Sequence, residues 1–424
     1  MHSLLIVVSV SIRLRTPVTA RINISIMNPH TTKENHIVTV NAGSSSLKLA
    51  VFTVHDMQKK FEAAVENIGQ LNSHLVTGSS SELVVAQTHT DAATLLTEWL
   101  YAHVEANTIT AVGHRIVHGG PKYYQTIAAT NSVLEVLRTF VAFDPEHLPI
   151  ELALVEMFMK DLPNALQTLC FDTAFHHDLP TRSRLLPIPR HFEAEGIRRY
   201  GFHGLSYSYI LDELHRVEGE AAANGKVIVA HLGSGASLAA LKNGNSVDTT
   251  MSMTPSSGIP MSMRSGDLDP GLLLYLSRTE GYDTNRLQYM ATFESGLLGI
   301  SETTNDMKKL LEIEDNDMRA KDAVDIFCYD IAKTIGGFAA ILGGLNTLVF
   351  TGGIGENAPK IRTRVCKELT FLGIRLDPVR NEAGSRLISV DGSPVGVHVI
   401  HSDEAATIAR ETNKILQGGS HGSY

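Results

Sequence analysis

A pattern that occurs twice constrains this chain more than any other feature. In each copy a short apolar strand leads into a tight turn of glycine and serine, and a second strand follows. The first copy spans residues 37–52 with its turn at 41–46, and the second spans residues 227–241 with its turn at 231–237. Two such hairpins half a chain apart favour two related α/β domains. Glycine and serine are also common in ordinary turns, so the repeat alone leaves this open.

Composition narrows the class of protein. The chain has 424 residues, of which 43% are hydrophobic and 19% charged, as expected for two or three globular domains. Its 36 basic and 45 acidic residues give a net charge of −9, which argues against a nucleic-acid partner. Three scattered cysteines, Cys170, Cys328 and Cys366, indicate no disulfide framework and favour a reducing cytoplasm.

The first residues form a separate segment. The apolar run 4–10 is much shorter than the roughly 20 residues that cross a bilayer, and Arg13 and Arg15 follow it rather than precede it. Residues 1–26 are therefore interpreted as an upstream start or a disordered arm, with a cleaved targeting segment as the alternative. Neither interpretation predicts a membrane partner.

The rest of the chain alternates predicted helices and strands. The spacing of apolar residues predicts helices over Val133–Phe143, Ile150–Met159, Ala323–Leu342 and Glu404–Ile415, and strands over Leu166–Phe171, Thr347–Phe350 and Val397–Ile400. A third glycine-rich segment, 351–357, directly follows a strand and is predicted to be a loop. A helix is expected after Pro359.

Three loops of small residues at strand ends favour a polyphosphate ligand. Backbone N–H groups in such loops can converge on an anion, and serine hydroxyls add further donors. The loops match neither the Walker sequence nor GxGxxG, which disfavours the P-loop and dinucleotide-binding folds.

Several single residues could carry chemistry, although each also has an ordinary structural explanation. Arg115 and Arg264 lie in glycine-containing segments, but a lone arginine is more often a solvated surface residue. Asp172 ends an apolar strand, where it could cap a helix, hold magnesium through water or act as a base. His203 could be a core or turn residue. His114 lies four residues before His118, but nothing else supports a zinc site.

Together these segments resemble the acetate kinase (acetokinase) family of the actin-like, hexokinase-like ATPase superfamily. The matching stretches occur in the family's order between residues 37 and 416: Asn41–Lys48, Gly113–Gly120, Phe171–His176, Arg199–Gly204, His231–Gly235, Arg264–Pro270 and Thr351–Asn357. The resemblance implies reversible ATP-dependent phosphorylation of a short-chain carboxylate. Magnesium would assist, with manganese as a substitute, and the enzyme would be a cytoplasmic homodimer.

The resemblance also implies a domain organisation. Two related ribonuclease-H-like (actin-like ATPase) α/β domains would enclose an active-site cleft. Residues 1–36 would be an N-terminal extension, and residues 37–174 together with a returning helix at 403–417 would form the N-terminal domain. Residues 175–402 would form the C-terminal domain, which binds nucleotide and dimerises.

The family's residue roles can be placed on matching positions. The catalytic group would comprise Arg115, which binds the substrate carboxylate, Asp172, His203 and Arg264. Magnesium would be held by Asn41 and Glu404. The acyl pocket would be formed by Val117, Phe202, Pro255 and His147. ATP would contact Lys48, His231, Leu232, Gly233, Ser234, Gly235, Asp306, Met307, Lys308, Gly353, Ile354, Gly355, Glu356 and Asn357.

Elementary chemistry agrees with these roles. A carboxylic acid is already ionised at neutral pH, so the acceptor needs no general base. The difficulty is the approach of one anion to another, which two arginines, a histidine donor and one magnesium ion would relieve. Asp172 is therefore better interpreted as organising magnesium and its waters than as accepting a proton.

Several positions depart from the usual family pattern and leave the acyl group open. Ser234 replaces a common asparagine, Leu205 and Tyr207 replace threonine and histidine, and the segment 251–263 is unusually rich in methionine. Glu146 stands where an apolar pocket residue is usual, so it points away from the pocket or the acyl group differs from acetyl.

Three functions remain in competition. Acetate is the first expectation for the acceptor, with propionate or butyrate as neighbours. A sugar kinase would need Asp172 as a true base and more polar pocket walls. A nucleotide-binding regulator without activity would have no need of the four catalytic side chains.

Overall fold

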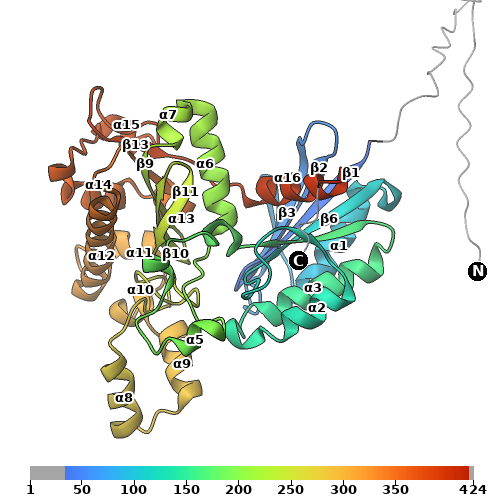
Figure 1. Cartoon of the computed structure of the whole chain (residues 1–424), viewed down its shortest axis with the longest axis horizontal. Coiled ribbons are helices and arrows are strands. Elements are labelled where there is room, and N and C mark those ends of the chain that lie inside the picture. The colour runs from blue at the N-terminus through green and yellow to red at the C-terminus, as the bar shows by residue number, and fades with distance from the viewer. Residues whose placement is uncertain (1–33, 420–424) are drawn as a thin grey trace, which may run out of the picture. The chain divides into compact units, whose positions relative to one another are not determined.

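The computed structural model describes residues 34–419, so the interpretation of residues 1–26 lies outside its described part. Two β-sheets organise these residues (Figure 1). The first sheet contains β1 (His36–Ala42), β2 (Ser46–Thr53), β3 (Lys59–Glu66), β4 (His74–Thr77), β5 (Ser80–Leu83), β6 (Ile109–Ile116), β7 (Ile127–Ala128) and β8 (Leu166–Phe171). The second sheet contains β9 (Lys226–Leu232), β10 (Ala236–Lys242), β11 (Asn245–Thr249), β12 (Thr347–Thr351) and β13 (Gly396–Val399).

The two sheets share one topology. The first has the order β5-β4-β3-β2-β1-β6-β8-β7 and the second the order β11-β10-β9-β12-β13. In β3-β2-β1-β6-β8, as in the whole second sheet, an antiparallel meander is followed by two strands added in parallel. The predicted fold class of two related α/β units is therefore confirmed. The residue boundaries given for the domains stay a prediction.

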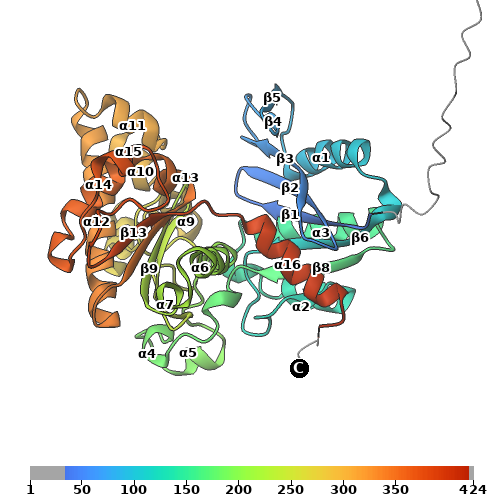
Figure 2. The same cartoon turned by 90° about the horizontal axis from the view of Figure 1, so that it is seen from above.

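Alternating side chains place helices on both faces of the first sheet. Val38 and Val40 of β1 pack with α1 (His89–His103) and α3 (Leu148–Asp161). Ile37 belongs to the opposite face, where it packs near Ala409 of α16 (Glu404–Leu416). The last helix of the described chain is α16. Figures 1 and 2 show it packed against the strands of the first sheet.

The second sheet is covered in the same way. Val227 and Val229 of β9 face α6 (Gly204–Glu218), whereas Ile228 and Ala230 share a core with α12 (Met318–Leu342). α12 begins at its N-cap Asp317, whose carboxylate accepts from the backbone N–H groups of Arg319 and Ala320, and ends at left-handed Gly343. The predicted helix Ala323–Leu342 is thus confirmed and extends one turn further at its start.

Two predicted elements were wrong in detail. The helix expected over Val133–Phe143 is α2 (Asn131–Arg138) followed by a separate 3₁₀ turn (Val141–Phe143). The Thr139 hydroxyl bonds the carbonyl of Val136 at 2.6 Å and so competes with the continuing helix. The segment 351–357, expected to be a loop, contains the short helix α13 (Gly352–Asn357).

Shorter elements complete the described chain. The remaining helices are α4 (Thr181–Arg184), α5 (His191–Ala194), α7 (Glu220–Ala223), α8 (Pro270–Thr279), α9 (Thr284–Phe293), α10 (Gly296–Ser301), α11 (Met307–Ile313), α14 (Pro359–Lys367) and α15 (Pro378–Glu382), with 3₁₀ turns at Ala106–Thr108, Ala174–His176 and Thr370–Leu372. Over residues 34–419 we find no helix with the length and apolar character needed to cross a bilayer.

Candidate active site

A cleft of about 920 Å³ opens where the glycine-rich turns of the two sheets meet, within the size range of ligand sites. Both hairpins, α13 and the start of α16 contribute to its walls. The predicted site residues that line it are Asn41, Lys48, Arg115, His203, His231, Gly233, Ser234, Gly235, Gly353, Glu356 and Glu404.

Parallel strands explain why residues far apart in sequence meet here. β1, β6 and β8 run parallel, so their carboxyl ends lie at one edge of the first sheet and bring Asn41, Arg115 and Asp172 there. β9 and β12 are parallel too, which pairs His231 with Thr351 at the corresponding edge of the second sheet. Ligands bind at such edges in many α/β folds.

Arg115 is the centre of a buried charge cluster. Its Nη2 donates to Oδ2 of Asp172 at 2.8 Å, and its Nη1 donates to the carbonyl of Ala42 at 2.7 Å and to Oε1 of Glu151 at 3.4 Å. Burial alone would lower the pKa of Arg115, but the carboxylates of Asp172, Glu151 and Glu404 raise it. Nε of Arg115 is buried and has no hydrogen-bond partner among residues 34–419.

Glu151 belongs to this cluster but was missed in the sequence. Its side chain is 1% exposed, and Oε2 accepts from the backbone N–H of Val117 at 2.7 Å. Burial raises the pKa of Glu151 to about 8, against the opposing effect of Arg115. The signal was present: Glu151 is an acidic residue on the face of α3 that also buries Leu148, Leu152 and Val155.

Asp172 is fully buried directly after β8. Besides Arg115, its Oδ2 accepts from the backbone N–H of His203 at 3.1 Å. The next residue along, Gly204, donates its N–H to the carbonyl of Asp172 at 2.8 Å. A Cβ on Gly204 would lie 2.3 Å from that carbonyl oxygen, so a larger residue would separate α6 from Asp172.

His203, His231 and Arg264 form the opposite side of the site. His203 has a left-handed backbone (φ 57°), and its ring stacks on that of His231 with centroids 4.2 Å apart. A Cβ built on Gly235 would lie 3.5 Å from Nε2 of His203 and 3.6 Å from Nη1 of Arg264, so the two groups flank one point. Burial, followed by the charges of His231 and Arg115, lowers the pKa of His203 well below its usual value.

Arg264 differs from Arg115 in its partners. Nη1 donates to the carbonyl of Pro255 at 3.1 Å, and no ion pair to a carboxylate occurs within the described chain. Burial lowers the pKa of Arg264, as expected for a cation that lacks a close counter-charge.

In the glycine-rich segment 351–357 after β12, the Glu356 carboxylate bonds back to the start of the same segment. Glu356 Oε1 accepts from the backbone N–H of Gly352 at 2.9 Å and from that of Ser402 at 3.2 Å, and Oε2 lies 2.6 Å from Nδ1 of His401. Gly352 has a φ of 77°, and a Cβ there would lie 2.7 Å from the carbonyl oxygen of Leu232. These bonds form one turn of helix where a loop was expected.

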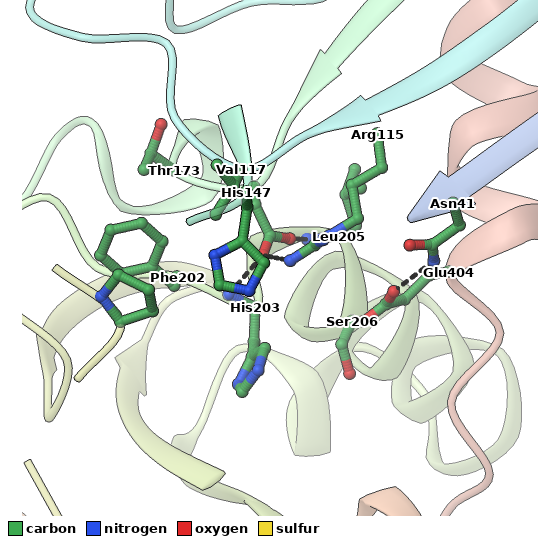
Figure 3. A network of polar contacts seen from close by, with 12 residues as sticks. Asn41, Arg115, Val117, His147, Thr173, Phe202, His203, Leu205, Ser206 and Glu404 are labelled. Atoms are coloured by element: carbon green, nitrogen blue, oxygen red, sulfur yellow. Dashed lines mark hydrogen bonds and ion pairs between the residues drawn. The ribbon is translucent and has the colours of Figure 1, made fainter. Parts of the chain in front are cut away.

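Asn41 and Glu404 could hold a divalent ion. Nδ2 of Asn41 donates to Oε2 of Glu404 at 2.7 Å, and both residues line the cleft (Figure 3). No cluster of three or more histidine, cysteine or acidic residues that could bind a metal occurs within residues 34–419. One carboxylate and one amide oxygen fit magnesium, which keeps several waters and shares phosphate oxygens rather than requiring a full protein cage.

The predicted acyl-pocket residues lie beside the charge cluster around Arg115. Val117 and Phe202 are buried, and Figure 3 shows both near His147. Nδ1 of His147 lies 2.9 Å from the Asp144 carboxylate. Glu146 accepts a hydrogen bond at 3.0 Å from Gln288 of α9, so its carboxylate is turned toward that helix.

Some predicted residues lie outside the cleft walls. Leu232 is fully buried in the core, and Asp306 is the N-cap of α11, where it accepts from the N–H of Lys308 at 2.9 Å. The other predicted residues that do not line the cleft are Met307, Lys308, Ile354, Gly355, Asn357, Asp172, Arg264, Val117, Phe202, Pro255 and His147. His114 and His118, which gave little support for a zinc site, hydrogen-bond to other residues instead. Nε2 of His114 bonds Gln167, and Nδ1 of His118 accepts from the N–H of Gly120.

Comparisons with known proteins agree with this architecture. The model of the acetokinase family matches residues 36–410. The chain is 40% identical over 395 residues to an acetate kinase from Rhodopseudomonas palustris strain TIE-1, covering 90% of this chain and 99% of that protein.

Two solved structures are also similar. A propionate kinase from Francisella tularensis superimposes with a TM-score of 0.83 at 32% identity, over 90% of this chain and 99% of that one. An acetate kinase from Porphyromonas gingivalis gives a TM-score of 0.80 at 34% identity, over 90% and 100% of the two chains.

Proposed function

The chain belongs to the acetokinase family, and from that premise we propose that it transfers the γ-phosphoryl group of ATP reversibly to acetate, giving acetyl phosphate and ADP. The alternative acceptors are propionate and butyrate. Relatives named for acetate and for propionate are both similar to this chain, which leaves the acyl group open. A regulator without activity, by contrast, would have no use for the charged cleft.

The observation that carries the proposal is the convergence of Arg264 and His203 on one point beside Gly235. Arg264 has no carboxylate partner in the described chain, and His203 presents a ring nitrogen there. Phosphoryl transfer depends on positioned donors around the three equatorial oxygens, so the part of the cleft next to Gly235 suits the transferring group.

Arg115 suits the carboxylate acceptor. Its Nε is a buried donor without a partner over residues 34–419, and a carboxylate from the cleft would satisfy it. The acceptor is ionised at neutral pH and attacks in line with the bond to the leaving ADP oxygen, so no residue need remove a proton. This arrangement distinguishes the proposal from a sugar kinase, in which Asp172 would act as a base.

Asn41 and Glu404 would hold magnesium, with manganese as a substitute. The ion would supply positive charge to the β- and γ-phosphate oxygens. Asp172 is fully buried and bonded to Arg115, so in this proposal it orients Arg115 and the waters near the ion. Asp172→Asn should abolish turnover, with partial recovery in Mn²⁺ or excess Mg²⁺. Total loss that no metal relieves, with unchanged ATP affinity, would argue against the role near the ion.

Trapping acyl phosphate with hydroxylamine tests the proposed activity. Purified enzyme with ATP and Mg²⁺ should yield the hydroxamate from acetate, and a panel with propionate, butyrate and glucose ranks the acceptors. Phosphorylation of glucose alone would support the sugar kinase, and no product from any acceptor would support the regulator.

The proposal includes a cytoplasmic homodimer. Leu274, Tyr275 and Tyr289 on α8 and α9 are each more than half exposed, which is unusual for large apolar side chains and suits a second copy of the chain. Sedimentation at several concentrations tests the dimer. The buried free thiols of Cys170, Cys328 and Cys366 suit a reducing compartment, which cell fractionation tests.

A further inference from the structure

A row of three hydrogen-bonded side chains leads from the interior to the cleft. Nδ1 of His203 lies 2.8 Å from Oγ of Ser237 in β10, and the same Oγ lies 2.6 Å from the hydroxyl of Tyr207 in α6. Tyr207 and Ser237 are fully buried. His203 precedes α6, and its left-handed backbone turns the residue into the site between the sheets.

The hydrogen-bonding groups of the row decide which side chain donates and which accepts. Within the described chain, Ser237 is the one hydrogen-bond partner of the Tyr207 hydroxyl. If Ser237 donated to Tyr207, the phenol proton would be buried without an acceptor. Tyr207 therefore donates to Ser237, and Ser237 donates its own proton to Nδ1 of His203. Burial also raises the pKa of Tyr207, so the phenol keeps its proton.

This direction decides which nitrogen of His203 is protonated. An imidazole that accepts at Nδ1 carries its single proton on Nε2. Nε2 is the atom that flanks the point beside Gly235 together with Nη1 of Arg264. Burial and then the charges of His231 on β9, Arg115 on β6, Arg264 and His176 lower the pKa of His203 and keep the ring neutral. The Asp172 carboxylate accepts from the backbone N–H of His203 and not from its ring.

We propose that Tyr207, acting through Ser237, is a positioning residue that fixes His203 in the Nε2–H form and so aims a neutral hydrogen-bond donor at the transferring phosphoryl group. The idea rests on the proposed function for its consequence in catalysis, but the position of the proton follows from the row itself. Tyr207 stands where the family usually has histidine, a side chain that can donate or accept. Because the Tyr207 hydroxyl is buried with Ser237 as its one partner within residues 34–419, the relay in this chain has a single direction.

Nuclear magnetic resonance of ¹⁵N-histidine-labelled enzyme tests the proton position directly. His203→Gln identifies the His203 signals by their loss. In the wild type, Nδ1 of His203 should show the shift of an unprotonated nitrogen and Nε2 that of a protonated one. In Tyr207→Phe, Ser237 loses its obligatory donor and becomes free to accept, so the two forms should mix.

Steady-state kinetics test whether the position of the proton on His203 affects catalysis. Tyr207→Phe and Ser237→Ala should each lower kcat about tenfold. This is part of the roughly 100-fold loss that removal of a preorganised donor causes. The KM values for ATP and acetate should stay within about twofold of those of the wild type. Ser237→Thr keeps the hydroxyl and should retain most of kcat. Ser246→Ala is the matched control, because Ser246 bonds Nδ1 of the buried His176 in the same way at 2.8 Å.

Several outcomes would overturn the proposal. A wild-type His203 protonated at Nδ1 would do so, as would a Tyr207→Phe enzyme with an unchanged tautomer and unchanged kcat. A shifted tautomer with full kcat would remove the role in catalysis. If Tyr207→Phe fails to fold, as judged by thermal melting, Ser237→Ala decides the same question. If the wild type makes no acyl phosphate, the proposed function fails alone, and the spectra still decide the direction of the row.

Discussion

The two sides of the cleft carry arginines in opposite electrostatic settings. At the edge of the first sheet, Arg115 is bonded to the buried Asp172 carboxylate and to the buried side chain of Glu151, whose raised pKa keeps it mainly protonated at neutral pH. Across the cleft, Arg264 bonds a backbone carbonyl, and His203 beside it stays neutral. The first side balances its own charge before any ligand enters, whereas the second leaves positive charge and a donor free. We infer that the first side organises the acceptor and the second receives the phosphoryl group.

Arg115→Ala should have the largest effect, because it removes a ligand contact and also leaves the buried Asp172 carboxylate without its cation. Breaking a buried pair in this way typically costs about 3–5 kcal/mol of the free energy of unfolding. We expect acyl phosphate formation to fall by at least about 1000-fold, the combined loss of binding and charge stabilisation. Hydroxamate assays and urea unfolding measure the two losses. Wild-type stability in this variant would show that the cluster is not a coupled unit.

Arg264→Ala should separate activity from stability. No carboxylate within residues 34–419 is left unpaired by this change, so the free energy of unfolding should fall by no more than about 1 kcal/mol. Loss of its charge at the phosphoryl group should lower kcat by about 100- to 1000-fold. Arg319→Ala provides a control, since Arg319 is an exposed arginine paired with Glu302. Equal destabilisation by Arg115→Ala and Arg264→Ala would remove the contrast between the two sides.

The sequence predicted this contrast only in part. Local patterns revealed the hairpins, the long helix α12 and the strand end that carries Asp172, because apolar periodicity and small-residue turns act over short distances. The family resemblance then supplied roles, which stay predictions. Glu151, by contrast, acquires its role from α3 packing against β6, a contact that no local pattern specifies.

The wrong prediction of a loop at 351–357 has the same origin. Glu356 turns the glycine-rich segment 351–357 into helix α13 through bonds to Ser402 and His401, nearly 50 residues further along the chain. Asp306, which the resemblance assigned to nucleotide contact, caps α11 and does not line the cleft, and its contact with nucleotide stays a prediction. Long-range partners therefore decide which polar residues serve the fold and which face the ligand.

Glu151→Gln tests whether Glu151 is protonated in the folded protein, through the pH dependence of the free energy of unfolding. The pKa of Glu151 is raised to about 8 in the folded protein, above its usual value, so the folded chain holds a proton that the unfolded chain has released. Its contribution to stability is complete below the usual pKa and is lost as the pH rises through about 8, by up to about 1.4 kcal/mol per pH unit. The glutamine variant should flatten this slope.

Urea unfolding between pH 5 and pH 9 measures the slope for the wild type and for Glu151→Gln. Glu156→Gln is the matched control, because Glu156 lies on the same helix and is about half exposed. Identical slopes in the wild type and Glu151→Gln would mean that Glu151 is ionised in the fold, and that the first side carries a net negative charge.

Glu146→Leu should have the smallest effect, because Glu146 lies at the rim of the site and not within either arginine cluster. Its carboxylate bonds Gln288 and acts on Arg264 through its charge. Leucine would remove this charge and add apolar surface at the rim, so KM for butyrate relative to acetate should fall by up to about tenfold. Gln288→Met, which keeps the carboxylate but frees it from α9, should shift the ratio in the opposite direction. Hydroxamate assays over the acid series give both ratios, and an unchanged ratio in both variants would exclude this rim from acyl selection.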